Sequence, residues 1–225
     1  MAGFRMHLTV STTLGVLYGA AAVRPCGFGP ETAVLATGLT AVGGMLPDLD
    51  SETGRPVREL TALAAAVLPL LLVPRLIYMG LSHEGVLATL IALYLLIRYV
   101  LPQILSKITV HRGMFHSVPA MLIAGLIVYL EYASPDRGLR LYLALGVMLG
   151  FLSHLILDEI YSVDFNGIRL KLKSSAGSAV KFISPSWVET SVCYGILGAL
   201  LVLAWRDLQH APAEQFQWVR TVAGR

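Results

Sequence analysis

The sequence has few charged residues for its length. Only 14% of its 225 residues are Asp, Glu, Lys or Arg, whereas soluble globular domains contain about 25%. Hydrophobic residues make up 56% of the chain, and several apolar runs approach the roughly 20 residues that cross a bilayer. This composition excludes an ordinary soluble domain and indicates an integral membrane protein.

Cysteine is also scarce. The two cysteines, Cys26 and Cys193, are too few for a disulfide framework, and the predicted topology puts them near opposite membrane faces, so we expect no bridge between them. No small-residue cleavage site follows the first apolar block, which indicates a retained first helix. The net charge of +3 favours no class of partner.

The apolar runs predict an all-α, polytopic transmembrane bundle of about seven spans. We expect residues 1–210 to form a single transmembrane helical domain and residues 211–225 to form a polar tail. One loop, residues 168–173, alternates apolar and basic residues and predicts a strand or a membrane-surface ribbon. The predicted spans cover residues 8–22, 31–46, 60–78, 86–105, 118–132, 139–157 and 188–205.

The sixth span ends in an unusual polar pair. His154 and Asp158 are four residues apart, so on a helix both side chains lie on one face. A neutral imidazole and a carboxylate on one face can bind a metal ion together. Ionisable groups at membrane depth are costly and indicate function. A structural hydrogen-bonded pair is the alternative.

Counting membrane crossings groups other polar residues with this pair. An even number of spans separates them, so all face one side whichever way the chain is inserted. His83 and His210 fall on the other side. The positive-inside rule favours the cytoplasm for the side that carries the group. Its members are His7, Asp48, Asp50, His111, His116, His154 and Asp158.

The local spacing allows these residues to converge. Asp48 and Asp50 point the same way only in an extended segment, which Pro47 favours by ending the helix. Gly113 allows His111 to lie in a loop while His116 begins a helix. The alternatives remain that the aspartates only solvate a loop and that His111 belongs to a basic cytoplasmic loop.

Four imidazoles and three carboxylates exceed the three protein ligands of a typical catalytic zinc ion. They suit two or three divalent ions, zinc first and manganese or magnesium as alternatives, with an aspartate bridging. Paired metal ions stabilise the attacking and leaving oxygens in phosphoester hydrolysis. We assign catalytic roles to Asp50 and to Arg112, whose guanidinium could hold a phosphate oxygen. Arg112, Lys171 and Lys173 are the predicted headgroup-binding residues.

Together these motifs resemble a bacterial inner-membrane family of metal-dependent hydrolases, the YdjM-like, LexA-regulated hydrolases. The resemblance covers roughly residues 6 to 160 and rests on His7 and on the segments 46–50, 111–117 and 150–158. The family is distantly similar to zinc-dependent phospholipase C and P1 nuclease. The resemblance implies a helical bundle with a multi-zinc phosphoesterase centre, and it implies the same seven residues as ligands. In place of the family's short aromatic and proline segment, this chain has the basic stretch 164–181.

The sequence therefore predicts a hydrolase of the bacterial inner membrane with its metal site on the cytoplasmic side. A phospholipid or lipid-linked phosphate is the expected substrate, attacked by metal-activated water, and nucleic acid is disfavoured as a partner. The alternative is a non-enzymatic membrane protein with a structural or ion-handling metal site. Transport is disfavoured because ionisable residues are nearly absent from the middle of the spans.

Overall fold

The structure is a computed structural model of the whole chain. It describes residues 3–50, 61–62, 64–66, 69–70, 72–108, 113–132, 134–166, 169–172 and 181–209. The predicted tail, 211–225, lies outside these ranges, so the single-domain boundary at residue 210 stays a prediction.

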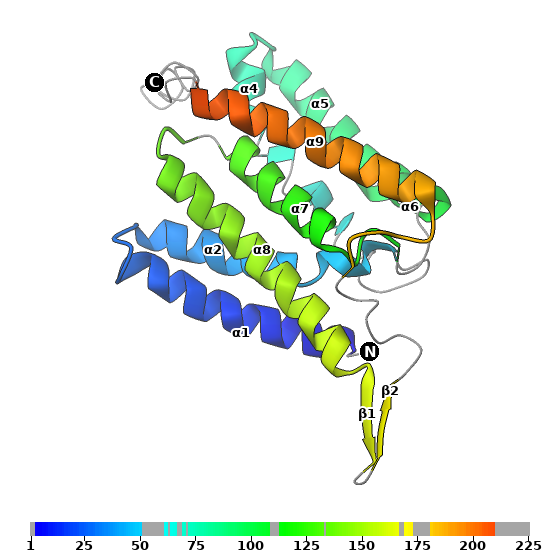
Figure 1. Cartoon of the computed structure of the whole chain (residues 1–225). Helices are drawn as coiled ribbons and strands as arrows, with labels where there is room; N and C mark the ends of the chain where they lie inside the picture. Colours follow the sequence, from blue (N-terminus) through cyan, green and yellow to red (C-terminus); the bar gives the residue numbers. More distant parts are fainter. Residues whose placement is uncertain are drawn as a thin grey trace.

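The described residues form a helical bundle with one small hairpin (Figure 1). This confirms the predicted all-α class. Residues 61–62, 64–66 and 69–70 are also helical. The elements are α1 (Phe4–Val23), α2 (Pro30–Gly43), the 3-10 helix η1 (Leu46–Asp50), α4 (Val73–Tyr78), α5 (His83–Leu95), the π-helix η2 (Leu96–Val100), α6 (Leu101–Ile108), α7 (Val118–Glu131), α8 (Arg137–Ile160), β1 (Val163–Asn166), β2 (Arg169–Leu172) and α9 (Trp187–Gln209).

Four helices in the described part of the chain are long and apolar enough to cross a membrane. They are α1, the continuous helical stretch His83–Ile104, α8 and α9. The second and fifth predicted spans form α2 and α7, each of 14 residues. A helix of that length is about 21 Å long, which is shorter than the roughly 30 Å hydrocarbon core. The count of seven crossings therefore stays a prediction.

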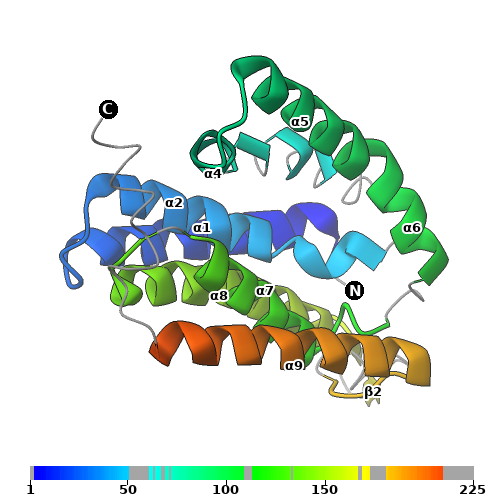
Figure 2. The same ribbon diagram turned by 90° about the horizontal axis from the view of Figure 1, so that it is seen from above.

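Helices α1, α2 and α8 pack together at one side of the bundle, while α7 lies between α8 and α9 (Figures 1 and 2). Small residues allow the close contact of α2 with α8. A Cβ atom on Gly150 would overlap the carbonyl oxygen of Thr40, and one on Gly43 would overlap that of Val147. Small residues are the usual contacts between membrane helices because they let backbones approach. Here they bring the end of α2 against α8.

Local signals fix where the helices begin. The Asp136 carboxylate accepts hydrogen bonds from the amides of Gly138 and Leu139 and so caps α8. The Ser117 hydroxyl accepts one from the amide of Ala120 at the start of α7. The beginning of α7, just after His116, is thus fixed by its cap.

The two strands form an antiparallel hairpin that begins three residues after α8 ends. Figure 1 shows the hairpin extending away from the helices. Strand β2 lies within residues 168–173, where the alternating sequence predicts a strand.

Candidate metal centre

Four separate parts of the chain contribute to one buried cluster. His7 lies in the first turns of α1, Asp48 in η1 and His116 just before α7, while His154 and Asp158 lie in the last turns of α8. His7, Asp48 and His116 are far apart in the sequence, and the fold brings all three to the end of α8. Four of the five are at most 3% exposed, whereas the Asp48 side chain is 21% exposed. The cluster is therefore closed on most sides and reaches the surface at Asp48.

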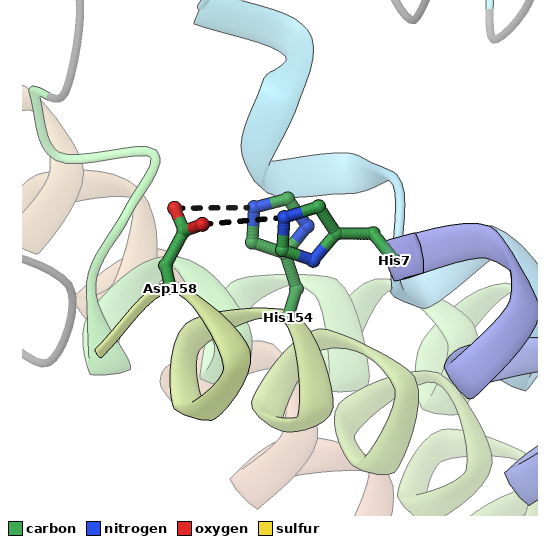
Figure 3. A group of neighbouring side chains, drawn as sticks. All are labelled: His7, His154 and Asp158. Atoms are coloured by element: carbon green, nitrogen blue, oxygen red, sulfur yellow. Dashed lines mark ion pairs between the residues drawn. The ribbon is translucent and has the colours of Figure 1, made fainter. Parts of the chain in front are cut away.

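The carboxylate of Asp158 lies at the centre of the cluster. Its Oδ1 atom is 3.2 Å from Nε2 of His7. Its Oδ2 atom is 3.7 Å from Nε2 of His154 and 3.8 Å from Nε2 of His116. Figure 3 shows the two oxygens facing the imidazoles of His7 and His154. One carboxylate thus faces three imidazoles.

The imidazole of His154 joins two groups of donor atoms. It stacks on the His7 ring with a centroid distance of 3.6 Å, and the His116 ring lies edge-on to it at 5.5 Å. Its Nε2 atom is also 3.7 Å from Oδ1 of Asp48. Two sets of three donors therefore each lie within 4.8 Å of one another: His7, His154 and Asp158, and Asp48, His116 and His154.

A backbone contact fixes the tautomer of His154. Its Nδ1 atom is 2.7 Å from the carbonyl oxygen of Gly44. A carbonyl oxygen can only accept a hydrogen bond, so Nδ1 carries the proton and Nε2 keeps its lone pair. Histidine ligands of metal ions are commonly oriented by such a second contact. The sequence analysis did not identify Gly44, which ends α2 against α8.

The donor set fits a divalent cation. Within the described residues, Nδ1 of His7, Nε2 of His154 and Oδ1 of Asp158 are buried and make no aligned hydrogen bond. Each such group costs about 1–3 kcal/mol when left unsatisfied. Two ligands about 2.1 Å from one tetrahedral ion lie about 3.4 Å apart, close to the 3.2–3.8 Å separations found here. A cation would satisfy Nε2 of His154 and Oδ1 of Asp158, which make no hydrogen bond among the described residues, and Nε2 of His7 lies close enough to Asp158 to serve as a further ligand.

Several predicted site residues are not placed in this cluster by the structure. His111, Arg112 and Lys173 lie outside the described residues. Asp50 and Lys171 are described by backbone alone, at the end of η1 and opposite Asp164 in the hairpin. The roles predicted for these five residues stay predictions.

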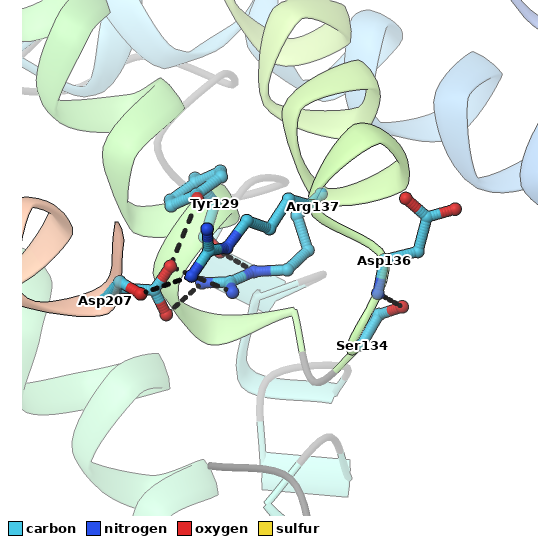
Figure 4. Close-up of polar contacts among 6 residues, drawn as sticks. Tyr129, Ser134, Asp136, Arg137 and Asp207 are labelled. Carbon is cyan, nitrogen blue, oxygen red and sulfur yellow. Dashed lines mark hydrogen bonds and ion pairs between the residues drawn. The ribbon is translucent and has the colours of Figure 1, made fainter. Parts of the chain in front are cut away.

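A second buried polar cluster lies at the other end of α8, and the sequence analysis missed it. Arg140 is 1% exposed and donates from Nη1 and Nη2 to the two carboxylate oxygens of Asp207, at 3.1 and 3.0 Å. Its Nε donates to the carbonyl of Tyr129, whose hydroxyl donates to Asp207 (Figure 4). The signal in the sequence was a cation, Arg140, within the sixth predicted span and a carboxylate, Asp207, just beyond the seventh.

The fold and this cluster define a class, that of helical membrane proteins with a buried histidine–aspartate centre at one end of the bundle. Residues 1–206 match the sequence model of the YdjM inner membrane protein family, and the chain belongs to that family. The resemblance to the YdjM-like family is thereby confirmed, as is a membrane location, whereas hydrolase activity stays a prediction. No curated protein and no solved structure matches the chain, so the more distant similarity to phospholipase C and P1 nuclease is not confirmed.

Proposed function

We propose that the protein is a membrane-bound, metal-dependent phosphoesterase that acts on a phospholipid or a lipid-linked phosphate. The observation that carries this proposal is the cluster of His7, His116, His154 and Asp158. It gathers buried metal-ligand atoms from distant parts of the chain, and three of its atoms lack hydrogen bonds among the described residues. Burying such groups without a partner is costly, so a ligand that satisfies them is expected.

The described donors account for one complete ligand set and part of a second. Both sets of three include His154, whose imidazole can bind only one ion, through Nε2, because Nδ1 is engaged by Gly44. Asp158 can contribute one oxygen to each of two ions. We therefore propose that Asp50 and His111 complete the second set. Zinc is the proposed ion, with manganese or magnesium as alternatives.

When bound, a divalent cation supplies Lewis-acid stabilisation of phosphate oxygens and a water molecule that loses its proton near neutral pH. The protein's own residues orient the ligand atoms and exclude bulk water. Gly44 holds the His154 ring, and the burial of the four inner residues keeps water from competing for it. Asp48, which is 21% exposed, forms the open edge. Arg112 is the proposed partner of a phosphate oxygen because a guanidinium binds it in a bidentate way.

The depth of the cluster favours a lipid phosphate. Asp158 lies about 32 Å along α8 from its first residue, Arg137, and the hydrocarbon core of a bilayer is about 30 Å thick. If α8 crosses the membrane, the cluster lies near the level of the headgroups. We propose that this level is on the cytoplasmic side, following the distribution of Lys and Arg.

A structural metal site is the second candidate. It is favoured by the burial of four of the five donors at 3% exposure or less, because closed coordination is typical of structural zinc. A hydrolase needs an open coordination position that a substrate can reach. Only turnover separates the two candidates, since both bind metal.

The test is an activity screen with purified, metal-loaded protein. The substrates are a panel of phospholipids, a lipid-linked phosphate and a soluble phosphodiester. We expect turnover of a lipid substrate, and we expect His154→Ala and Asp158→Ala to abolish it without unfolding the protein. His83→Ala is the matched control, because His83 is an exposed imidazole at the start of α5. Bound metal without turnover of any substrate would favour the structural site.

A further inference from the structure

The hairpin that follows α8 has one apolar face. Its register sets Val163 opposite Leu172 and Phe165 opposite Leu170. Residues directly opposite one another in an antiparallel pair belong to the same face, and alternate residues of one strand share a face. All four apolar residues therefore lie on one face of the ribbon.

The other face carries polar and basic residues. Asp164 is opposite Lys171, and Asn166 is opposite Arg169. Two cations and one carboxylate give this face a net positive charge. The hairpin is thus an amphipathic ribbon with complete separation of its two faces. A register shift of one residue would set the apolar residues of one strand beside the polar residues of the other.

The ribbon directly follows one candidate membrane span and precedes another. It begins three residues after α8 ends at Ile160, and α9 begins at Trp187. Both helices are candidate spans. They run antiparallel, because Arg140 near the start of α8 pairs with Asp207 near the end of α9. The end of α8, from which the hairpin follows, therefore lies at the same side of the bundle as the start of α9.

Exposed apolar and aromatic residues flank the ribbon on both sides. Before it, Ile160 and Tyr161 are 60% and 41% exposed; after it, Phe182 and Trp187 are 58% and 80% exposed. Tyr and Trp are enriched at the boundary between membrane and water. The residues on either side of the ribbon in the sequence thus have the composition of a membrane interface.

An isolated two-stranded hairpin is marginally stable in water and needs a cover for its apolar face. We propose that the Val163–Leu172 hairpin lies in the membrane interface, with its apolar face in the boundary between headgroups and acyl chains. Arg169 and Lys171 on the other face then attract anionic lipid headgroups. Binding of the hairpin to the interface needs neither a bound metal nor hydrolysis, so its test is independent of the proposed function.

The test uses spin labels on the full-length protein in lipid nanodiscs. In a background with Cys26→Ser and Cys193→Ala, single cysteines replace Phe165 or Leu170 on the apolar face. Each label is then measured for collisions with oxygen, which concentrates in lipid, and with a water-soluble nickel complex. We expect labels at both positions to collide mainly with oxygen, at a depth of about 5–10 Å.

Cysteines in place of Asn166 and Arg169 are the matched controls, because these two residues are paired on the polar face. Labels there should collide mainly with the nickel complex. Equal nickel access at all four positions would overturn the proposal, because the hairpin would then lie in water. Protection of positions 165 and 170 from both reagents would also overturn it, since protein or a second copy would then cover the face.

The charge of the lipid tests the second half of the proposal. The depth of the label at position 165 is compared between nanodiscs of phosphatidylcholine alone and nanodiscs that contain phosphatidylglycerol. We expect a deeper position in the anionic lipid, and loss of that shift in the variant carrying Arg169→Gln and Lys171→Gln. The same depth in both lipids would contradict recognition of anionic headgroups.

Discussion

Helix α8 carries a buried polar cluster near each of its ends, and the two differ in how their hydrogen bonds are satisfied. Near its start, Nε, Nη1 and Nη2 of Arg140 each donate a hydrogen bond, and both carboxylate oxygens of Asp207 accept at least one. Near its end, Nε2 of His154 and Oδ1 of Asp158 make none among the described residues. Burial is similar at the two ends, at 1% for Arg140 and 3% for Asp158.

The difference separates a structural pair from a ligand site. A buried ion pair in which each nitrogen and each oxygen makes a hydrogen bond needs no further partner, and this one joins α8 to α9. A buried group of donors without hydrogen bonds is costly in the fold unless a ligand completes it. Burial of an ionisable residue in a membrane helix thus indicates a ligand site only where its hydrogen bonds are also incomplete.

The largest expected effect is at the Arg140 end. Asp207→Ala leaves the Arg140 guanidinium buried without its carboxylate, which typically costs about 3–5 kcal/mol. Thermal or denaturant unfolding in detergent measures this loss. Replacing both partners, by Arg140→Met with Asp207→Leu, should restore most of the stability, since no buried charge remains. An Asp207→Ala variant as stable as the wild type would remove the contrast between the two ends.

Removal of the bound metal ion tests the cluster near the end of α8. A ligand at 100 times its Kd stabilises the folded state by about 2.7 kcal/mol, so a chelator should lower the unfolding temperature of the wild-type protein. Asp158→Ala, which loses the central carboxylate, should show no such shift. If the chelator affects wild type and variant equally, the stabilising ion is bound elsewhere.

The contact between α2 and α8 links the His154 end to the packing of the bundle. In Gly150→Ala, the added Cβ overlaps the Thr40 carbonyl, so we expect a loss of about 1–3 kcal/mol. It also shifts the helix that presents His154 to Gly44, so metal affinity should fall about 10–100-fold. Gly198→Ala is the control, because a Cβ there meets no atom of the described residues within 4 Å. Equal metal affinity in both variants would contradict the positioning role of this contact.

The smallest expected effect is at the cap that follows His116. Ser117→Ala removes the N-cap of α7 and should cost about 1 kcal/mol, with a further few-fold loss of metal affinity because His116 precedes the cap. Ser82→Ala removes the equivalent cap of α5, where no ligand is adjacent, and should affect stability alone. Calorimetry with metal titration measures both quantities. A loss of affinity in the Ser82 variant would show that the effect is not local.

The sequence was sufficient to predict the all-α class and the residues that the cluster contains. His7, Asp48, His116, His154 and Asp158 were grouped by counting crossings, and the structure brings these five together. Such counting uses only which ends of helices share a face and needs no knowledge of how the helices pack. Which atoms approach one another depends on packing, and no residue pattern encodes that directly.

Other features followed from packing alone. The carbonyl of Gly44 reaches His154 only because α2 and α8 come close at their glycines, and glycines indicate close approach without naming the partner. Arg140 and Asp207 are 67 residues apart, and hydropathy cannot pair them. The alternating residues of β2 predicted a strand, whereas β1 has no comparable alternation of basic residues and was identified only through its register with β2.

Elemental analysis of the purified protein tests the central claim most directly. After expression with zinc and manganese supplied, wild-type protein should retain about two ions per chain, the number that a bridging carboxylate and paired sites allow, and His154→Ala should retain far less. The His83→Ala control should match the wild type. Wild-type protein without bound metal, or a His154→Ala variant with the same content as the wild type, would contradict the account.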